Sequence, residues 1–121
     1  VVMPIHSDVK FVDIIRRHYL GILHQAGVKI YFYTQSNLHS KGLMIDNKIF
    51  SISSANFDYR SFRYQYELAL IGEETSMIPQ LRQHFDSTLK HCTSFNYQEW
   101  KNRSIFKRLS EVILLPFRYL F

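Results

Sequence analysis

The sequence has few of the residues that cross-link or interrupt a chain: one cysteine, four glycines and three prolines among 121 residues. Because Cys92 is the single thiol, no internal disulfide can form, and nothing in the sequence points to an oxidising compartment. No second cysteine lies at metal-ligand spacing, which argues against a cysteine-bound metal. No apolar run reaches the ~20 residues that cross a bilayer.

Hydrophobic and basic residues are abundant instead. Hydrophobic residues make up 46% of the chain, including eight Tyr and ten Phe, which predicts a packed core and argues against global disorder. The length suits one domain. Fifteen Lys and Arg against ten Asp and Glu give a net charge of +5. This excess favours anionic partners, although charge alone does not distinguish phospholipid headgroups from a nucleic-acid backbone.

The first third of the chain predicts a helix followed by a strand. Apolar residues recur at helical spacing over residues 11–23, Ser7 or Asp8 can cap the start, and Gly27 can end the helix. The β-branched and aromatic run at 28–33 is typical of a strand. Such a helix-to-strand unit with a short connection is characteristic of layered α/β folds.

The middle of the chain predicts a hairpin and a polar loop. Two apolar runs, 38–45 and 49–52, flank Asp46-Asn47-Lys48, a composition that favours a hairpin turn. Residues 53–61 are expected to form the polar loop. A strand at 66–71 follows.

The last third predicts one helix, a linker and a tail. The helix runs from about Met77 to Lys90 with Thr75 or Ser76 as its cap. A polar linker at 91–96 leads to the tail at 97–121, which is basic and amphipathic. Pro116 should bend or interrupt the tail helix. The tail can lie in a membrane interface or dock on the domain, and the sequence favours neither.

One stretch of the sequence carries groups suited to phosphoryl chemistry. His39 and Lys41 are two residues apart, so a strand would place both on one face. A histidine can attack phosphorus or transfer a proton, and a lysine can stabilise phosphoryl oxygens. Ser54 and Asn56 return short polar donors after the hairpin. Asp46 has the opposite parity and lies at the turn, so we expect an ion pair or turn hydrogen bond there.

The joint spacing resembles the motif of the phospholipase D superfamily, His-x-Lys, four residues, Asp, six residues, then Gly-Ser-x-Asn. The matching residues are His39, Lys41, Asp46, Ser54 and Asn56, and the glycine position holds Ser53. Five further stretches of this sequence resemble the C-terminal part of bacterial cardiolipin synthases: residues 26–31, 56–62, 66–67, 99–103 and 106–109.

The resemblance implies an α/β fold, with a mixed β-sheet flanked by helices that forms one half of a two-motif catalytic fold. Residues 1–96 would be the C-terminal catalytic half-domain, and 97–121 a separate basic tail. Because the sequence opens on Val1-Val2-Met3-Pro4, which is typical of a strand's end, we expect the half-domain to be truncated at its N-terminus. The half would pair with an upstream half carrying the other motif, or with a second copy as a homodimer.

The resemblance also implies residue roles. His39, Lys41 and Asp46 would form the catalytic set, with His39 as general acid and base because the nucleophile usually comes from the other motif. Lys41 and Asn56 would bind phosphoryl oxygens, and Ser54 would support the loop. Glu67 would orient the His39 ring, or would simply be an exposed strand residue. No metal or other cofactor is expected.

The expected function is phosphatidyl transfer between two phosphatidylglycerol molecules, giving cardiolipin and glycerol through a phosphohistidine. The alternatives are a phospholipase, a homodimeric nuclease, or an inactive lipid-binding half-domain. The expected partners are anionic phospholipid and the bacterial cell membrane, on its cytoplasmic side or otherwise associated with it, and nucleic acid is not expected. A sheet edge meant for the other half could be left exposed.

Overall fold

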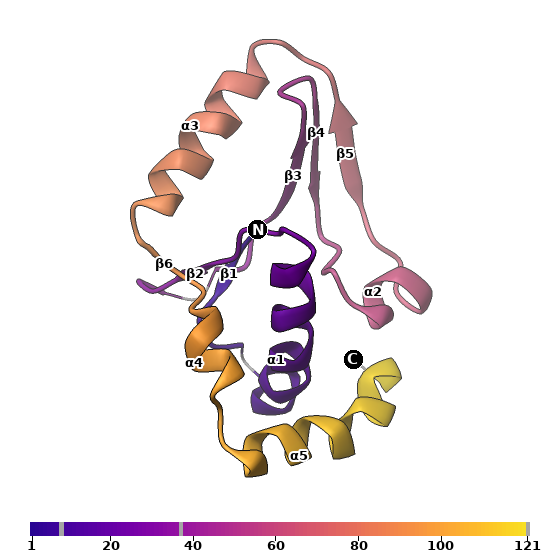
Figure 1. Cartoon of the computed structure of the whole chain (residues 1–121). Coiled ribbons are helices and arrows are strands. Elements are labelled where there is room, and N and C mark those ends of the chain that lie inside the picture. Colours follow the sequence, from indigo (N-terminus) through magenta and orange to yellow (C-terminus); the bar gives the residue numbers. More distant parts are fainter. Residues whose placement is uncertain (8, 37, 121) are drawn as a thin grey trace. The chain divides into compact units, whose positions relative to one another are not determined.

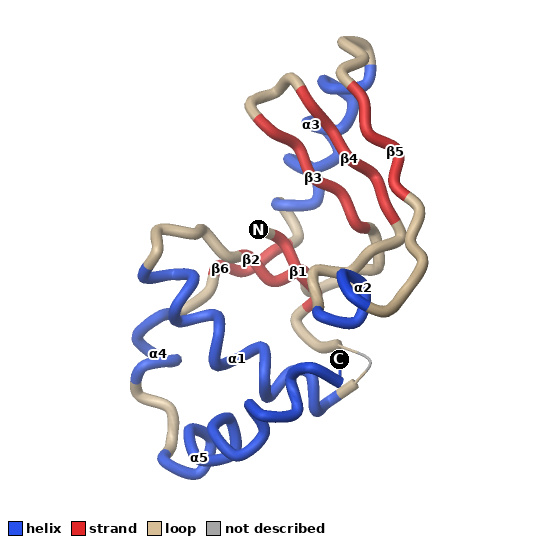
Figure 2. The backbone as a smooth tube through the Cα atoms, turned by 90° about the vertical axis from the view of Figure 1, so that its right-hand side faces the viewer, coloured by secondary structure: helices blue, strands red, loops and turns tan. Residues whose placement is uncertain are grey.

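The structure, a computed structural model, describes all residues except Asp8, Asn37 and Phe121, so the cap predicted at Asp8 lies outside the described residues. The chain divides into two compact units. The tail unit consists of residues 1–38 and 92–121, and the hairpin unit consists of residues 39–91. The backbone of both is shown in Figure 1 and Figure 2.

The tail unit contains a small mixed sheet of three short strands. β1 (Val2–Pro4) pairs in parallel with β2 (Tyr31–Tyr33), and β2 pairs antiparallel with β6 (Cys92–Ser94). The strand end predicted at the start of the sequence is therefore present. The strand predicted over 28–33 is shorter than expected, and β6 lies in what we predicted to be a linker. Its Cys-Thr-Ser sequence has no apolar alternation, so only pairing with β2 makes it a strand.

Helix α1 (Lys10–Gln25) follows the prediction closely and ends as Gly27 indicated. Gly27 has a φ of 86°, and its N–H donates to the His24 carbonyl, while Val28 N–H donates to the Leu23 carbonyl. These two bonds form a Schellman motif, which requires the left-handed conformation that glycine adopts readily. The predicted side-chain cap at Ser7 is wrong, because Val9 is the N-cap and the Ser7 hydroxyl bonds Val9 instead.

The tail folds back as α4 (Tyr97–Lys101), α5 (Ile105–Leu114) and a 3₁₀ helix (Leu115–Leu120). Asn96 caps α4, since its side-chain oxygen accepts hydrogen bonds from two backbone N–H groups. The α-helix gives way to the 3₁₀ helix just before Pro116, as the missing proline N–H predicts.

The tail is docked on α1 by specific contacts. The Trp100 indole N–H donates to the Arg17 carbonyl at 2.7 Å. The indole ring lies so close to Gly21 that a Cβ there would stand 2.1 Å from it. The Tyr97 ring stacks on both His24 and Trp100, and α4 and α5 run beside α1 in Figure 2. One side of the tail is therefore docked on the domain, which was one of the two alternatives that the sequence left open.

The hairpin unit contains the second sheet, in the order β3 (Lys41–Ile45), β4 (Ile49–Ser53) and β5 (Ala69–Gly72), all antiparallel. A short helix α2 (Tyr59–Arg63) precedes β5, and α3 (Met77–Leu89) follows it. Phe50 and Ile78 are its buried apolar residues among those described. The α/β class with small sheets flanked by helices is confirmed, with the strands divided between two sheets.

The predicted hairpin is present, with its turn where the sequence placed it. Asp46 and Asn47 both have a φ of 52°, and Lys48 N–H donates to the Ile45 carbonyl. Positive φ at both central residues is the requirement of a type I′ turn, which Asp and Asn tolerate.

Three boundaries in this unit were predicted wrongly. The strand expected from residue 38 begins at Lys41, and the strand expected over 66–71 begins at Ala69. The expected loop over 53–61 contains the start of α2. The predicted helix at 77–90 is confirmed as α3, and Ser76 is its N-cap without a side-chain hydrogen bond. No helix in the described part of the chain combines the length and apolar character needed to cross a membrane.

Candidate active site

Four of the residues singled out in the sequence, His39, Lys41, Ser54 and Glu67, lie at one end of the β3–β4–β5 sheet. Lys41, the first residue of β3, lies opposite Ser53, the last residue of β4, and Ser53 lies opposite Ala69, the first residue of β5. His39, Ser54 and Glu67 each lie within two residues of these strand ends. Because neighbouring antiparallel strands begin and end at alternate edges, the sheet itself gathers these side chains.

His39 and Lys41 are joined through the backbone. The Lys41 ammonium donates a hydrogen bond to the His39 carbonyl at 2.7 Å. His39 is exposed and precedes β3, which begins at Lys41. The prediction that one strand carries both side chains is therefore wrong for His39. An ammonium has three N–H donors. One of them fixes Lys41 against the loop that carries His39, and two remain for an anionic ligand.

Ser54 ties the end of β4 to the start of β5. Its backbone N–H donates to the Leu68 carbonyl, and its hydroxyl oxygen accepts from Leu68 N–H, each at 3.0 Å. The hydroxyl donates to Glu67 Oε2 at 2.5 Å. Between described residues, no hydrogen bond joins Glu67 to the His39 ring. The structure thus places Glu67 on Ser54, and its expected action on His39 stays a prediction.

The second carboxylate oxygen of Glu67 is held by Gln65, which in turn contacts Arg60. In the amide orientation that satisfies both neighbours, Gln65 donates to Glu67 Oε1 at 3.1 Å and accepts from Arg60 Nε at 3.0 Å. Arg60 therefore acts on the site through Gln65 and Glu67. Gln65 was missed by sequence reasoning, because an amide between two charged residues has no spacing signature.

The loop after Ser54 is shaped by α2. The Asp58 carboxylate accepts from Ser61 N–H at 2.7 Å and so caps this helix. The Ser61 hydroxyl, on a residue that is 6% exposed, accepts from the backbone N–H of Asn56 at 3.1 Å. This contact fixes the backbone of Asn56 and leaves its side chain at the surface.

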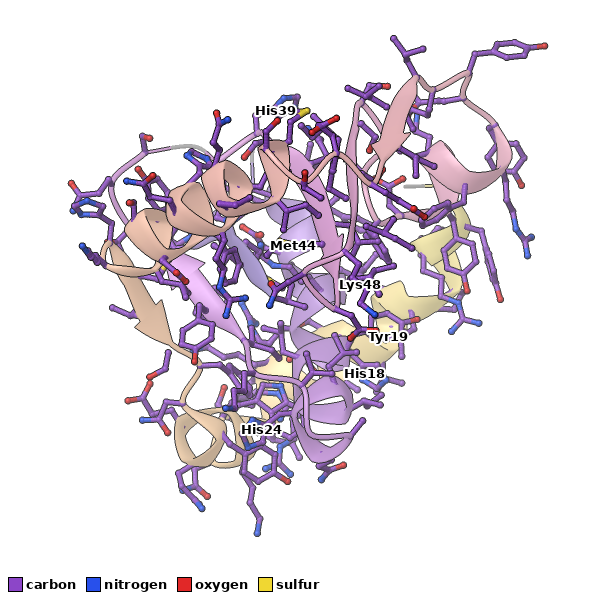
Figure 3. All side chains as sticks on the ribbon, turned by 90° about the horizontal axis from the view of Figure 1, so that it is seen from above. His18, Tyr19, His24, His39, Met44 and Lys48 are labelled. Atoms are coloured by element: carbon purple, nitrogen blue, oxygen red, sulfur yellow. The ribbon has the colours of Figure 1, made fainter. Side chains whose placement is uncertain are left out.

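Asp46 lies at the opposite end of the hairpin from His39. It is in the turn between β3 and β4, about 17 Å from Lys41 at the usual rise per strand residue. Figure 3 shows His39 well separated from Lys48, which follows Asp46 by two residues at that turn. The structure therefore groups Lys41, Ser54 and Glu67 near His39 and leaves Asp46 apart from them. Among the described residues, no cluster of three His, Cys, Asp or Glu side chains could hold a metal ion.

Comparison with known proteins identifies the family of this arrangement. A family model with the description "Cardiolipin synthase, PLD-like domain" matches residues 1–89, which include both strand ends and the hairpin. The chain belongs to this family.

Curated relatives of the family align along nearly the whole chain. A cardiolipin synthase of Clostridium perfringens (strain SM101) is 33% identical over 114 residues, 94% of this chain and 24% of that protein. The cardiolipin synthase of Alkalihalophilus pseudofirmus is 34% identical over 92% of this chain and 22% of its own length. That of Geobacillus kaustophilus is 34% identical over 91% and 22% respectively. The chain thus spans about a quarter of the length of each of these relatives.

Proposed function

We propose that this chain supplies one half of an active site that transfers a phosphatidyl group from one phosphatidylglycerol to another, giving cardiolipin and glycerol. The observation that carries the proposal is the grouping of His39, Lys41, Ser54 and Glu67 at one exposed end of a sheet, in a chain that belongs to the cardiolipin synthase family. The other half of the site would come from a second His-x-Lys motif, in an upstream part of a longer protein or in a second copy of this chain.

The reaction proceeds in two displacements at phosphorus. The histidine of the other motif attacks the phosphorus, a nitrogen–phosphorus bond forms, and the bond to the glycerol oxygen breaks. His39 as imidazolium donates the proton that this oxygen takes up. Neutral His39 then removes the proton from the hydroxyl of a second phosphatidylglycerol. That oxygen attacks the phosphorus and the nitrogen–phosphorus bond breaks.

The neighbours of His39 stabilise charge and fix geometry. Lys41, held at the His39 carbonyl, presents its remaining N–H donors to the phosphoryl oxygens, and the exposed Asn56 amide adds another donor. Ser54 and Glu67 hold the strand ends together, and Glu67 is the proposed group that orients the His39 ring. Asp46 contributes by forming the turn.

The test is product analysis with labelled phosphatidylglycerol, in vesicles, added to the chain alone and to the chain joined to a segment that carries a second motif. Cardiolipin and glycerol in equal amounts are expected only in the joined sample. Turnover by the chain alone would instead show that two copies build the site.

A hydrolase is the second candidate, favoured by the single motif and the net charge of +5. It predicts phosphatidic acid as the main product, or cleavage of a nucleic acid by a dimer of the chain. Either product in place of cardiolipin would contradict the transferase. If lipid bound without any turnover, the chain would be an inactive lipid-binding half-domain.

A further inference from the structure

Helix α5 presents its apolar side to the outside of the tail unit. Its outward side chains follow the i, i+1, i+4, i+7, i+8 pattern of one helix face and are 55% to 80% exposed; they are Ile105, Phe106, Leu109, Val112 and Ile113. A surface helix normally turns its polar face to water and its apolar face to the protein core. A continuous apolar face of this kind marks a surface that contacts something other than water.

A buried ion pair fixes the direction in which this face points. Glu111, 1% exposed, accepts hydrogen bonds from Arg103 Nε and Nη2 at 2.9 and 2.8 Å, and Arg17 of α1 lies 4.0 Å away. If α5 rotated to bury its apolar side chains, Glu111 would be exposed and Arg103 would lose its partner. Since breaking a buried ion pair is costly, the outward direction is built into the fold.

The charge of the tail indicates what covers the face. Residues 97–121 carry five basic side chains and two acidic ones, and one of the acidic residues is the buried Glu111. Lys107 and Arg108 interrupt the apolar series on α5 itself, and both are exposed. An apolar helix face bordered by long cationic side chains is the arrangement of a helix that lies in the interface of an anionic bilayer.

We propose that α5 docks the tail unit on an anionic lipid surface, with Phe106 and Ile113 inserted among the lipids and the Arg103–Glu111 pair facing away from them. The inference deepens the proposed function, since it names the surface from which that site takes its lipid. It depends only on contacts within the tail unit, so it can fail or hold independently of the chemistry at His39.

The experiment is co-sedimentation of the full chain with phosphatidylcholine vesicles prepared with and without phosphatidylserine, an anionic lipid that keeps the proposed substrate out of the assay. Phe106→Ser combined with Ile113→Ser should weaken binding to the anionic vesicles by about tenfold or more, because two inserted apolar side chains are lost. The matched control is Ile22→Ser with Leu23→Ser, which removes two exposed apolar side chains from α1 of the same unit. Circular dichroism checks that both variants fold.

A second pair of variants tests the charge. Lys101→Gln with Lys107→Gln should lower binding to anionic vesicles by about thirtyfold, at roughly 1 kcal/mol for each basic residue near the surface, and should leave binding to neutral vesicles unchanged. Equal binding by the chain and by Phe106→Ser/Ile113→Ser would overturn the proposal. A dimer in solution that those substitutions make monomeric, without vesicle binding, would assign the face to a second copy instead.

Discussion

The two units of the chain are held together in different ways. In the tail unit, residues far apart in sequence are joined by side-chain hydrogen bonds: Trp100 donates to the Arg17 carbonyl, Gln25 to the Tyr97 hydroxyl, and Arg118 to the Tyr19 hydroxyl. In the hairpin unit, the sheet is a ladder of neighbouring antiparallel strands, two of which are joined by a tight turn.

The side chains around the candidate site reflect this difference. Phe57 is 89% exposed and Leu68 is 81% exposed, both within a few residues of Ser54 or Glu67. The hairpin unit therefore gathers reactive groups without enclosing them, while the tail unit is held by contacts between residues far apart in the sequence. Changes in the first should alter chemistry more than stability, and changes in the second should do the reverse.

The largest effect is expected at His39. When the chain is joined to a segment that carries a second motif, His39→Ala should lower the proposed cardiolipin formation by about a thousandfold, since general acid–base catalysis contributes on that order. The unfolding midpoint in urea should stay within error of the original, because His39 is exposed. His84→Ala, which removes an exposed histidine of α3 in the same unit, is the matched control. Equal losses in both variants would exclude a specific role for His39.

Glu111→Ala should produce the largest loss of stability. The substitution leaves Arg103 without its carboxylate partner, and removing one member of a buried pair costs about 3 kcal/mol. Urea unfolding measures the loss. The exposed Glu73, replaced in Glu73→Ala, should change stability by no more than about 0.5 kcal/mol. A similar small change for Glu111→Ala would mean that the tail is not held by this pair.

Ser54→Ala should have a smaller effect, confined to the strand ends. Leu68 N–H loses its acceptor and Glu67 loses a donor, so about 1 kcal/mol of stability should be lost. Hydrogen exchange should show faster exchange at the Leu68 amide, with amides of α1 unaffected. Ser40→Ala, at an exposed serine between His39 and Lys41, is the control. Unchanged exchange at Leu68 would contradict the role of the Ser54 hydroxyl.

The smallest effect is expected at the turn. Asn47→Gly should raise the free energy of unfolding by about 0.5 kcal/mol, because glycine adopts positive φ at no steric cost. Lys48→Gly, at the next residue, does not relieve a positive φ and should be neutral or destabilising. Equal urea midpoints for the two variants would argue against a strained turn.

The elements that the sequence predicted well have local causes. The end of α1 at Gly27 and the turn at Asp46 and Asn47 depend on φ values that few residues adopt, so composition reveals them. The grouping of Lys41 with Ser54 follows from the hairpin, because an antiparallel ladder returns the chain to the same end of the sheet. The family resemblance is confirmed by the match over residues 1–89.

The features that the sequence did not predict depend on distant partners. β6 is a strand only because it pairs with β2, and the domain boundary predicted at residue 96 stays a prediction. The Gln65 contact with Glu67 needs the fold of α2 to bring it into place. The direction in which the apolar face of α5 points depends on the ion pair between Arg103 and Glu111. These residues are eight apart, and no helical or strand periodicity predicts that they pair.

The close packing of the Trp100 ring against Gly21 has a spectroscopic consequence. The sequence holds one tryptophan, so indole emission comes from the tail unit alone. When α4 separates from α1, the ring loses the Arg17 carbonyl and its close packing on Gly21, and its emission should shift to longer wavelength. Circular dichroism reports both units together. A difference between the two unfolding curves would therefore show the tail unit and the hairpin unit melting as independent cooperative blocks.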